Sequence, residues 1–462
     1  MSRVSLRPDL SPLRGSRGYR AAFVSRNVAM LGSQAAEVAL LVQAKQLTGS
    51  PLVVGLLGVA ELLPLVIFGL YGGALADRFD RRALMRWCEP GLAGCAGLLL
   101  LNGLLPHPLV WPLFVVSAAM MAFASLQRPA FEAAIPRLVP MEQITAASAL
   151  LSATQNIGVL LGSSLGGVLA VAPGPWLVYA LDAAGFVVSF FMLSRLPPLP
   201  PEAAPQVEHA GPAEDGTDAP SAAQPGQALR DILVGLRYAI SRKDLLGSYL
   251  ADLSAMIFAY PTALFPFMAV ALRAPWATGL MFAAPSVGAF VVSATSGWMG
   301  QVRRHGLAIA AGAALWGAAI VGFGLSPDIY VALGFLAVAG GADEISAIFR
   351  DTLWKQTIPD HLRGRMAGIE LLSYAAGPPA GQLRSGVVAS LAGLRFSLVS
   401  GGIACVAAVG AVCAALPAFS RYVAVVPTAA GVSAETPASV FPRAPSREHG
   451  ATDTLRPANP AP

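Results

Sequence analysis

Long apolar segments, each near the roughly 20 residues that a helix needs to cross a bilayer, recur along most of the chain. Short connections rich in glycine, proline or polar residues separate them, so the pattern predicts twelve transmembrane helices. The first six are expected at residues 19–45, 51–76, 83–105, 109–126, 146–171 and 176–194. The other six are expected at residues 245–272, 278–298, 307–325, 330–349, 366–391 and 396–416.

Composition supports lipid as the main solvent. Hydrophobic residues make up 55% of the 462 residues, charged residues only 12%, and the mean hydropathy is +0.61. Such a chain cannot present a mostly polar surface to water, and its short connections leave no room for a soluble enzyme domain. We therefore expect a membrane protein without enzymatic activity, cofactor or metal.

Histidine and cysteine add no candidate chemistry. The histidines are scattered over connections and termini and are expected to face solvent: His107, His209, His305, His361 and His449. The cysteines lie within apolar segments and lack the paired spacing of metal ligands. They are expected to be small core residues rather than disulfides: Cys88, Cys95, Cys405 and Cys413.

The chain divides between its sixth and seventh apolar segments. Residues 197–229 are rich in proline, alanine and acidic residues and lack the apolar content to fold alone, which predicts a flexible linker. The linker separates an N-terminal six-helix half, residues 19–196, from a C-terminal half, residues 230–417. Residues 1–18 form a short tail, and residues 418–462 share the composition of the linker and are expected to be disordered.

Basic residues accumulate in every second connection. Positively charged loops stay on the cytoplasmic side, so these connections, the linker and both termini are predicted to be cytoplasmic. The arginines are dispersed, which indicates topology rather than nucleic-acid binding. The residues concerned are Arg78, Arg81, Arg82, Arg86, Arg128, Arg137, Arg303, Arg304, Lys355, Arg363 and Arg365.

The two halves repeat one stretch of sequence. Residues 73–82 (GALADRFDRR) follow the second segment, and residues 297–306 repeat them in degenerate form after the eighth. A parallel repeat of six spans is how one large group of secondary transporters is built, with the substrate path between the halves. The predicted fold class is an all-α polytopic membrane protein with two six-helix halves in pseudo-twofold repeat.

Residues 73–82 resemble the signature loop between the second and third helices of the major facilitator superfamily, G-x-L-a-D-R-x-[GD]-R-R. Gly73 would allow close helix approach, and the charged positions would form a cluster that is made or broken between two conformations. The resemblance assigns a latch against the other half to Asp77, Arg78 and Arg81, and Arg82 completes the charged set. The alternative is an anchor that only fixes orientation.

The fifth segment carries Gly158, Gly162, Gly166 and Gly167 along one helical face, where another backbone can approach closely. This stretch resembles the antiporter signature G-x-x-x-G-P-x-x-G-G, which marks exporters within the superfamily. Ser163 stands where the pattern has proline. Ordinary helix packing is the alternative interpretation.

Three further stretches extend the resemblance: residues 47–51, residues 136–140 with 146–156, and residues 358–366. Together they are similar to the branch of the superfamily that contains siderophore exporters, transmembrane secretion effectors and macrolide-efflux proteins. The resemblance implies a monomeric, proton-driven exporter of siderophores, drugs or similar amphipathic metabolites in the bacterial inner membrane. Its partners would be lipid, protons and a small-molecule substrate that the sequence does not identify.

Ionisable side chains inside the predicted spans are the candidates for a proton and substrate path. Such a residue costs about 2.5–3.5 kcal/mol at a helix centre, so it normally faces a cavity or a partner. Glu61, near the middle of the second segment, is the first candidate for the coupling proton. Glu37 and Arg26 lie about three turns apart on one face of the first segment and could line the path.

The C-terminal half offers a second set of charges. Asp343 and Glu344 are adjacent in the tenth segment and point about 100° apart, so one of them is expected to face the cavity. Asp252 is left open between a structural pair and a functional role. The other charged residues are placed nearer helix ends, where pairing or snorkelling explains them: Asp182, Glu370 and Arg384.

Two alternatives to an exporter stay open. One is a lipid or lysolipid transporter, whose cavity would open to the bilayer, and the other is a non-transporting sensor or scaffold with the same fold. The ionisable residues inside the predicted spans disfavour the sensor or scaffold. The aromatic residues of the C-terminal half are expected to face lipid or the core rather than a ligand: Phe258, Tyr260, Trp316 and Phe335.

Overall fold

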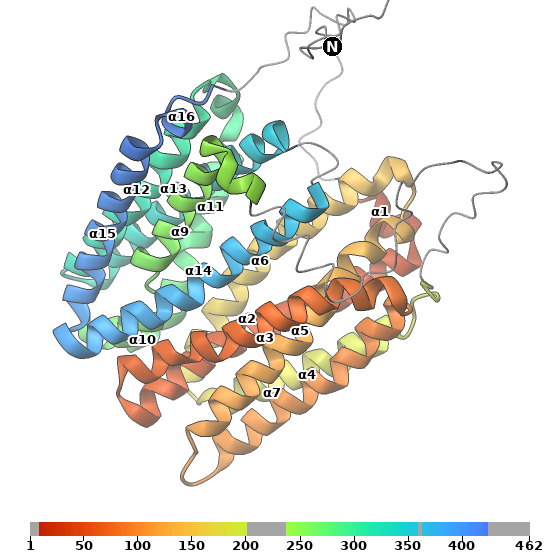
Figure 1. Ribbon diagram of the computed structural model, residues 1–462. Helices are drawn as coiled ribbons and strands as arrows, with labels where there is room; N and C mark the ends of the chain where they lie inside the picture. The colour runs from red at the N-terminus through yellow and green to blue at the C-terminus, as the bar shows by residue number, and fades with distance from the viewer. Residues whose placement is uncertain (1–8, 201–236, 359–362, 424–462) are drawn as a thin grey trace, which may run out of the picture. The chain divides into compact units, whose positions relative to one another are not determined.

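The computed structural model describes residues 9–200, 237–358 and 363–423, except for the side chains of residues 70–74, 76–78, 153, 156 and 363–375. Every regular element in this part of the chain is a helix (Figure 1). Ten of its helices are long and apolar enough to cross a membrane, and α2 and α14 have similar length with more polar residues. The predicted all-α membrane fold is confirmed.

The N-terminal half contains α2 (Arg17–Thr48), α3 (Pro51–Arg78), α4 (Arg81–Leu104), α5 (Trp111–Leu138), α6 (Ile144–Val171) and α7 (Pro175–Leu193), after the short α1 (Ser11–Gly15). The C-terminal half contains α9 (Lys243–Ala259), α10 (Phe265–Ala271), α11 (Thr278–Ala294), α12 (His305–Leu325), α13 (Ile329–Thr357), α14 (Arg363–Ala392) and α15 (Leu394–Ala415), then the short α16 (Pro417–Ser420). Short 3-10 turns join some of them: η1 (Met141–Gln143), η2 (Thr262–Leu264), η3 (Pro275–Ala277) and η4 (Ser296–Gln301).

The predicted span at residues 245–272 is two helices rather than one. Helix α9 ends at Ala259, and the chain restarts through η2 as α10. The cause is Pro261, because a proline disfavours helical backbone at the residue before it, here Tyr260. The break lies inside the bundle and shapes the candidate site described below.

Two predicted helix ends are wrong. Helix α5 continues past residue 126 to Leu138, through Pro129 and Pro136, and α13 continues past residue 349 to Thr357. Proline inside a long membrane helix is tolerated where neighbouring groups satisfy the freed carbonyls. Polar residues that looked like loop sequence therefore belong to helices.

Consecutive membrane spans run in opposite directions, with α9 and α10 together forming one span, so the span ends gather on two faces (Figure 1). We call the face where α2 begins and α15 ends the terminal face, and the face with the α2–α3 connection the far face. Gly49 makes that connection with φ 62°, a left-handed conformation that glycine adopts without strain. On the terminal face, the Asp80 carboxylate caps α4 by accepting a hydrogen bond from the Ala83 amide at 2.9 Å.

The halves meet near the far face through two helix pairs, α3 with α14 and α6 with α11, and Figure 1 shows α3 and α14 side by side. A Cβ on Gly58 of α3 would lie 3.0 Å from the Cα of Pro379 in α14. A Cβ on Gly167 of α6 would collide with Gly279 of α11. Glycine at these positions lets the backbones of the two halves touch.

The end of the C-terminal half folds back over its own terminal face. Phe419 of α16 is fully buried in a notch formed by Gly247 of α9 and Gly306 of α12, and a Cβ on either glycine would collide with residue 419. Residues 418–423, which the sequence analysis places in a disordered tail, therefore form part of the folded unit. The buried ring of Phe419 anchors this segment to the bundle, and the composition of the segment alone does not indicate that contact.

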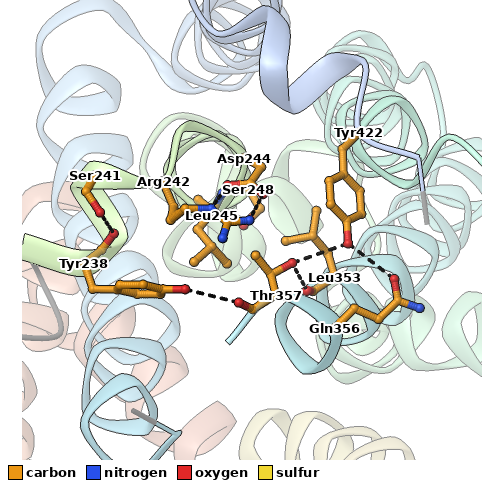
Figure 2. A network of polar contacts seen from close by, with 10 residues as sticks. All are labelled: Tyr238, Ser241, Arg242, Asp244, Leu245, Ser248, Leu353, Gln356, Thr357 and Tyr422. Carbon is orange, nitrogen blue, oxygen red and sulfur yellow. Dashed lines mark hydrogen bonds and ion pairs between the residues drawn. The ribbon is translucent and has the colours of Figure 1, made fainter. Parts of the chain in front are cut away.

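A polar network extends this closure to the end of α13. Figure 2 shows Tyr238 and Tyr422 approaching Thr357 from opposite sides. The Tyr238 hydroxyl donates to the Thr357 carbonyl at 3.2 Å, and the Tyr422 hydroxyl lies 3.4 Å from Thr357 Oγ1. The Tyr422 hydroxyl also donates to Gln356 Oε1 at 3.3 Å. Side chains from three distant parts of the sequence thus fix the terminal end of α13.

One predicted histidine position is wrong. His305 opens α12 and is buried against Phe349, with ring centroids 5.0 Å apart, because the helix start packs under α16 rather than facing solvent. His107 is exposed as expected, and the other three histidines lie outside the described residues. The expected core position of the cysteines is confirmed for three buried, free thiols: Cys88, Cys95 and Cys405.

Candidate functional site

Three cavities lie along α2. The terminal cavity, about 320 Å³, is bordered by α2, α5 and α6, near the terminal face. The N-half cavity, about 300 Å³, is bordered by α2, α3, α4 and α5. The interhalf cavity, about 300 Å³, lies between α2 and α6 of the N-terminal half and α10 to α13 of the C-terminal half. Residues of α2 therefore border all three of these cavities.

Three predicted acids line the two inner cavities. Glu37 is exposed although it lies inside α2, because it borders both the N-half and the interhalf cavity. Glu61 lines the N-half cavity, and Asp343 lines the interhalf cavity. No lysine or arginine is among the described residues that line these two cavities. None of the three carboxyl groups forms an ion pair within the described part of the chain.

The adjacent acids of α13 have different surroundings. Asp343 faces the interhalf cavity, whereas Glu344 accepts a hydrogen bond at 2.5 Å from the Ser293 hydroxyl of α11. The rotation of about 100° between neighbouring helix positions accounts for this divergence. Of the two, Asp343 is the one placed to meet a ligand.

Asp252 forms a buried ion pair with Arg350, whose side chain is 12% exposed against 3% for the aspartate. The Arg350 guanidinium also lies 5.6 Å from the Trp354 ring centroid. Arg350 is not among the predicted site residues, because the predicted tenth span ends one residue before it. A continuous helix would have placed Arg350 two turns from Asp343 on the same face, a signal that was available.

Arg26 opens to the terminal cavity rather than to the acids. Its guanidinium lies 5.1 Å from the centroid of Phe131 on α5. Gln34, two turns further along α2, lines both inner cavities beside Glu37. Helix α2 therefore presents a cation near the terminal face and an acid in the middle.

Aromatic residues form part of the interhalf cavity wall, which the sequence analysis did not expect for Tyr260 and Trp316. The break after α9 turns Tyr260 toward the cavity. Trp316 Nε1 donates to the Ala259 carbonyl at 3.1 Å, which satisfies an acceptor that the helix end leaves free. Phe265 and Phe282 complete the aromatic wall, with ring centroids 4.8 Å apart.

The remaining charged residues of the spans differ from one another. Arg384 donates to the Ser397 carbonyl at 3.0 Å, a local structural contact. The Glu370 side chain lies outside the described residues. The expected place of Asp182 near a helix end is wrong, because it lies well inside α7 and is fully buried.

The described arginines of the predicted latch contact their own half in this structure. Arg81 Nη1 donates to the Ala133 carbonyl at 3.1 Å, and Arg82 Nη2 donates to the Ser194 carbonyl at 2.7 Å. The side chains of the other latch residues lie outside the described part: Gly73, Asp77 and Arg78. Arg81 and Arg82 thus hold α4 to the ends of α5 and α7.

The glycines of α6 have two packing partners. A Cβ on Gly162 would lie 2.8 Å from the Leu31 carbonyl of α2, and Gly158 and Gly166 face the same helix. Gly167 faces Gly279 of the other half instead. The motif therefore joins the cavity-lining α2 to the contact between the halves.

Known proteins share this arrangement. The chain matches the family model described as transmembrane secretion effector over residues 8–425. It is 30% identical over 411 residues to an enterobactin exporter of Citrobacter koseri, covering 87% of this chain and 92% of that protein. It is 28% identical over 373 residues to an enterobactin exporter of Shigella flexneri, covering 80% and 84%.

Solved structures agree on the fold. A POT family transporter in complex with 5-aminolevulinic acid superposes with a TM-score of 0.67 at 10% identity, covering 88% of this chain and 97% of that one. A bacterial homolog of the human lysosomal transporter Spinster, inward-facing and unoccupied, gives 0.65 at 14% identity, covering 88% and 99%. The chain therefore belongs to the transmembrane secretion effector family of the major facilitator superfamily and is a multi-pass membrane transporter, not an enzyme.

Proposed function

We propose that the protein is a monomeric, proton-coupled exporter of the bacterial inner membrane that works by alternating access. Its cargo is an amphipathic small molecule such as a siderophore or drug. The observation that carries the proposal is the interhalf cavity, where Glu37 of one half and Asp343 of the other border the same space. The enterobactin-exporter relatives support the export direction.

The acids supply a physical basis for coupling. A carboxylate inside a membrane protein needs a proton or a partner, and no described residue of these cavities is basic. A proton and a cationic or hydrogen-bond-donating cargo would therefore compete for the same oxygens. Such competition is what exchange of one for the other requires.

The contacts between the halves support a rocking motion. Gly58 with Pro379 and Gly167 with Gly279 bring the backbones together near the far face. If the terminal face is cytoplasmic, as the arginine distribution predicts, this conformation corresponds to an inward-facing state. The latch of Asp77, Arg78 and Arg81 would engage the other half when the terminal face closes.

The cavity walls support an amphipathic cargo. Tyr260, Phe265, Phe282 and Trp316 offer aromatic surface, while Glu37 and Asp343 offer charge. A molecule with flat apolar and polar parts fits both chemistries. A lipid cargo would instead require the cavity to open sideways to the bilayer.

Transport in proteoliposomes tests the proposal. Cargo uptake into these proteoliposomes should fall at least tenfold when an ionophore collapses the pH gradient, and Glu37→Gln should abolish the response to the gradient. Glu142→Gln, an exposed residue of η1, is the control and should behave as the unmodified protein. Equal transport with and without the gradient would refute proton coupling.

A further inference from the structure

A second pair of acids lies inside the N-terminal half, among residues that do not line the described cavities. Asp182 of α7 is 0% exposed, and neither of its carboxyl oxygens has a hydrogen-bond partner among the residues that the structure describes. Glu89 of α4 is 2% exposed, and its Oε2 also has none. Burying two carboxyl groups with oxygens that lack hydrogen bonds reduces the stability of the fold, so a function would explain their presence.

Asp182 is enclosed by tightly packed backbone and apolar side chains. Gly32 of α2 lies against it, and a Cβ there would be 3.0 Å from the Asp182 Cα. The neighbouring cluster between α4 and α7 is apolar, built around Leu92, Ala96 and Phe186. In the described parts of the chain no cation pairs with Asp182.

The protonated form fits this environment. An unpaired carboxylate withdrawn from water costs several kcal/mol even after local relaxation, on the order of the penalty for a buried ion. A neutral carboxylic acid avoids that charge penalty and only gives up hydrogen bonds. Asp182 therefore holds its proton while the N-terminal half has this packing.

Polar groups continue from Asp182 toward the terminal face. Ser189 lies two turns further along α7, about 10.5 Å in helix rise, and its Oγ is 2.6 Å from Ser25 Oγ. Ser189 also lies beside Glu89, whose Oε1 accepts a hydrogen bond from Gln127 Nε2 at 2.6 Å. Among the described residues, Glu89 is thus the next ionisable group in that direction.

The surroundings contain few other titratable groups. The negative charge of Glu89 on α4 acts on Asp182, and Asp182 in turn acts on Tyr179 of the same helix. The Tyr179 hydroxyl donates a hydrogen bond to Gln43 Oε1 at 2.8 Å. Helix α2 presents Gly32, and α6 contains no ionisable side chain. The state of Asp182 is therefore governed by its burial and by Glu89.

The C-terminal half shows that this fold packs its outer helices without buried acids. Helices α12 and α15 hold the places in the repeat that α4 and α7 hold here, and neither contains an acidic residue. If buried acids were needed to pack these outer helices, both halves would carry them. Their restriction to one half indicates a task of that half.

We propose that Asp182 is a second proton-binding carboxyl, separate from the cargo cavities, and that its proton exchanges with the terminal face on the side of Ser189 and Glu89. Its contribution to transport rests on the proposed proton coupling, whereas the binding of the proton does not.

Infrared spectroscopy of the purified protein tests the binding. At neutral pH, the carbonyl band of protonated carboxylic acids should be present, and Asp182→Asn should remove one component of it, leaving any contribution of Glu37, Glu61 and Asp343. Asp182→Glu should shift that component rather than remove it, which keeps the test valid if the asparagine variant folds poorly. Glu142→Gln is the exposed control and should leave the band unchanged. An unaltered band in both Asp182 variants would overturn the proposal.

Deuterium exchange of the same band tests the route. In Glu89→Gln the exchange should slow at least tenfold, because the acceptor between Asp182 and the terminal face is gone. Unchanged exchange would overturn the role of Glu89. If transport proves independent of the pH gradient while the Asp182 band is found, the proposed coupling fails and the proton site stands.

Discussion

Each half covers the terminal ends of its own helices, but the two halves do so with different chemistry. In each, the segment after the sixth helix folds back over the bundle. In the N-terminal half, Asp80 accepts from the Leu199 amide at 2.9 Å and Arg82 donates to the Ser194 carbonyl. In the C-terminal half, Phe419 fills a notch between glycines.

The difference follows from the two versions of the repeated stretch. Residues 73–82 retain the acids and arginines, whereas residues 297–306 have lost the acids and end in His305 and Gly306, which pack in the core. Hydrogen bonds to backbone can be exchanged one at a time, whereas a buried ring leaves a cavity when it moves. We therefore expect the N-terminal half to have the adaptable terminal face and the C-terminal half the fixed one.

The largest expected effect comes from emptying the notch. Phe419→Ala should reduce the free energy of unfolding by about 3–5 kcal/mol, because a fully buried ring is lost and the backbone around Gly247 and Gly306 cannot collapse far. Denaturing-detergent titration of the purified protein measures the change. Phe396→Ala on α15, where the ring is 57% exposed, is the matched control. Equal losses of stability for the two variants would contradict the claim that the buried Phe419 ring fixes the terminal end of the C-terminal half.

A somewhat smaller effect is expected at the ion pair of the C-terminal half. Asp252→Asn leaves Arg350 without its charged partner inside the bundle and should cost about 3 kcal/mol in the same titration. The neighbouring Asp351→Asn is the control, since its pair with Lys355 is 58% and 72% exposed and should contribute about 0–1 kcal/mol. A large loss in the control alone would contradict the reasoning from burial.

The sequence predicted the parts of the fold that depend on hydropathy and on backbone volume. Each apolar segment became a helix or, at Pro261, two. The glycine spacing in α6 correctly indicated close helix approach, because a missing Cβ acts wherever that face packs. Glu37, Glu61 and Asp343 line cavities, because an acid inside a span is too unfavourable in lipid and must face a cavity or a partner.

The rest depends on partners that are distant in sequence. Arg350 falls one residue beyond the predicted tenth span, and its contact with Asp252 on α9 explains its place in the bundle. Phe419 lies beyond the last predicted span, and the glycines that receive it belong to α9 and α12. Glu89 and Asp182 carried no motif, so their burial emerged from packing alone.

The smallest effect, and the most direct test of an adaptable N-terminal face, concerns Arg82. Replacing it with methionine keeps the apolar stem but removes the charge-assisted bond to Ser194, which should cost about 1.5–3 kcal/mol. Arg304→Met is the control, because Arg304 is exposed in the corresponding loop of the C-terminal half and should change stability by less than about 0.5 kcal/mol. If the bond is remade during transport, Arg82→Met should also change the transport rate by more than Phe396→Ala, which alters only an exposed ring. A stability loss without any change in rate would show that the N-terminal face is as fixed as the C-terminal one.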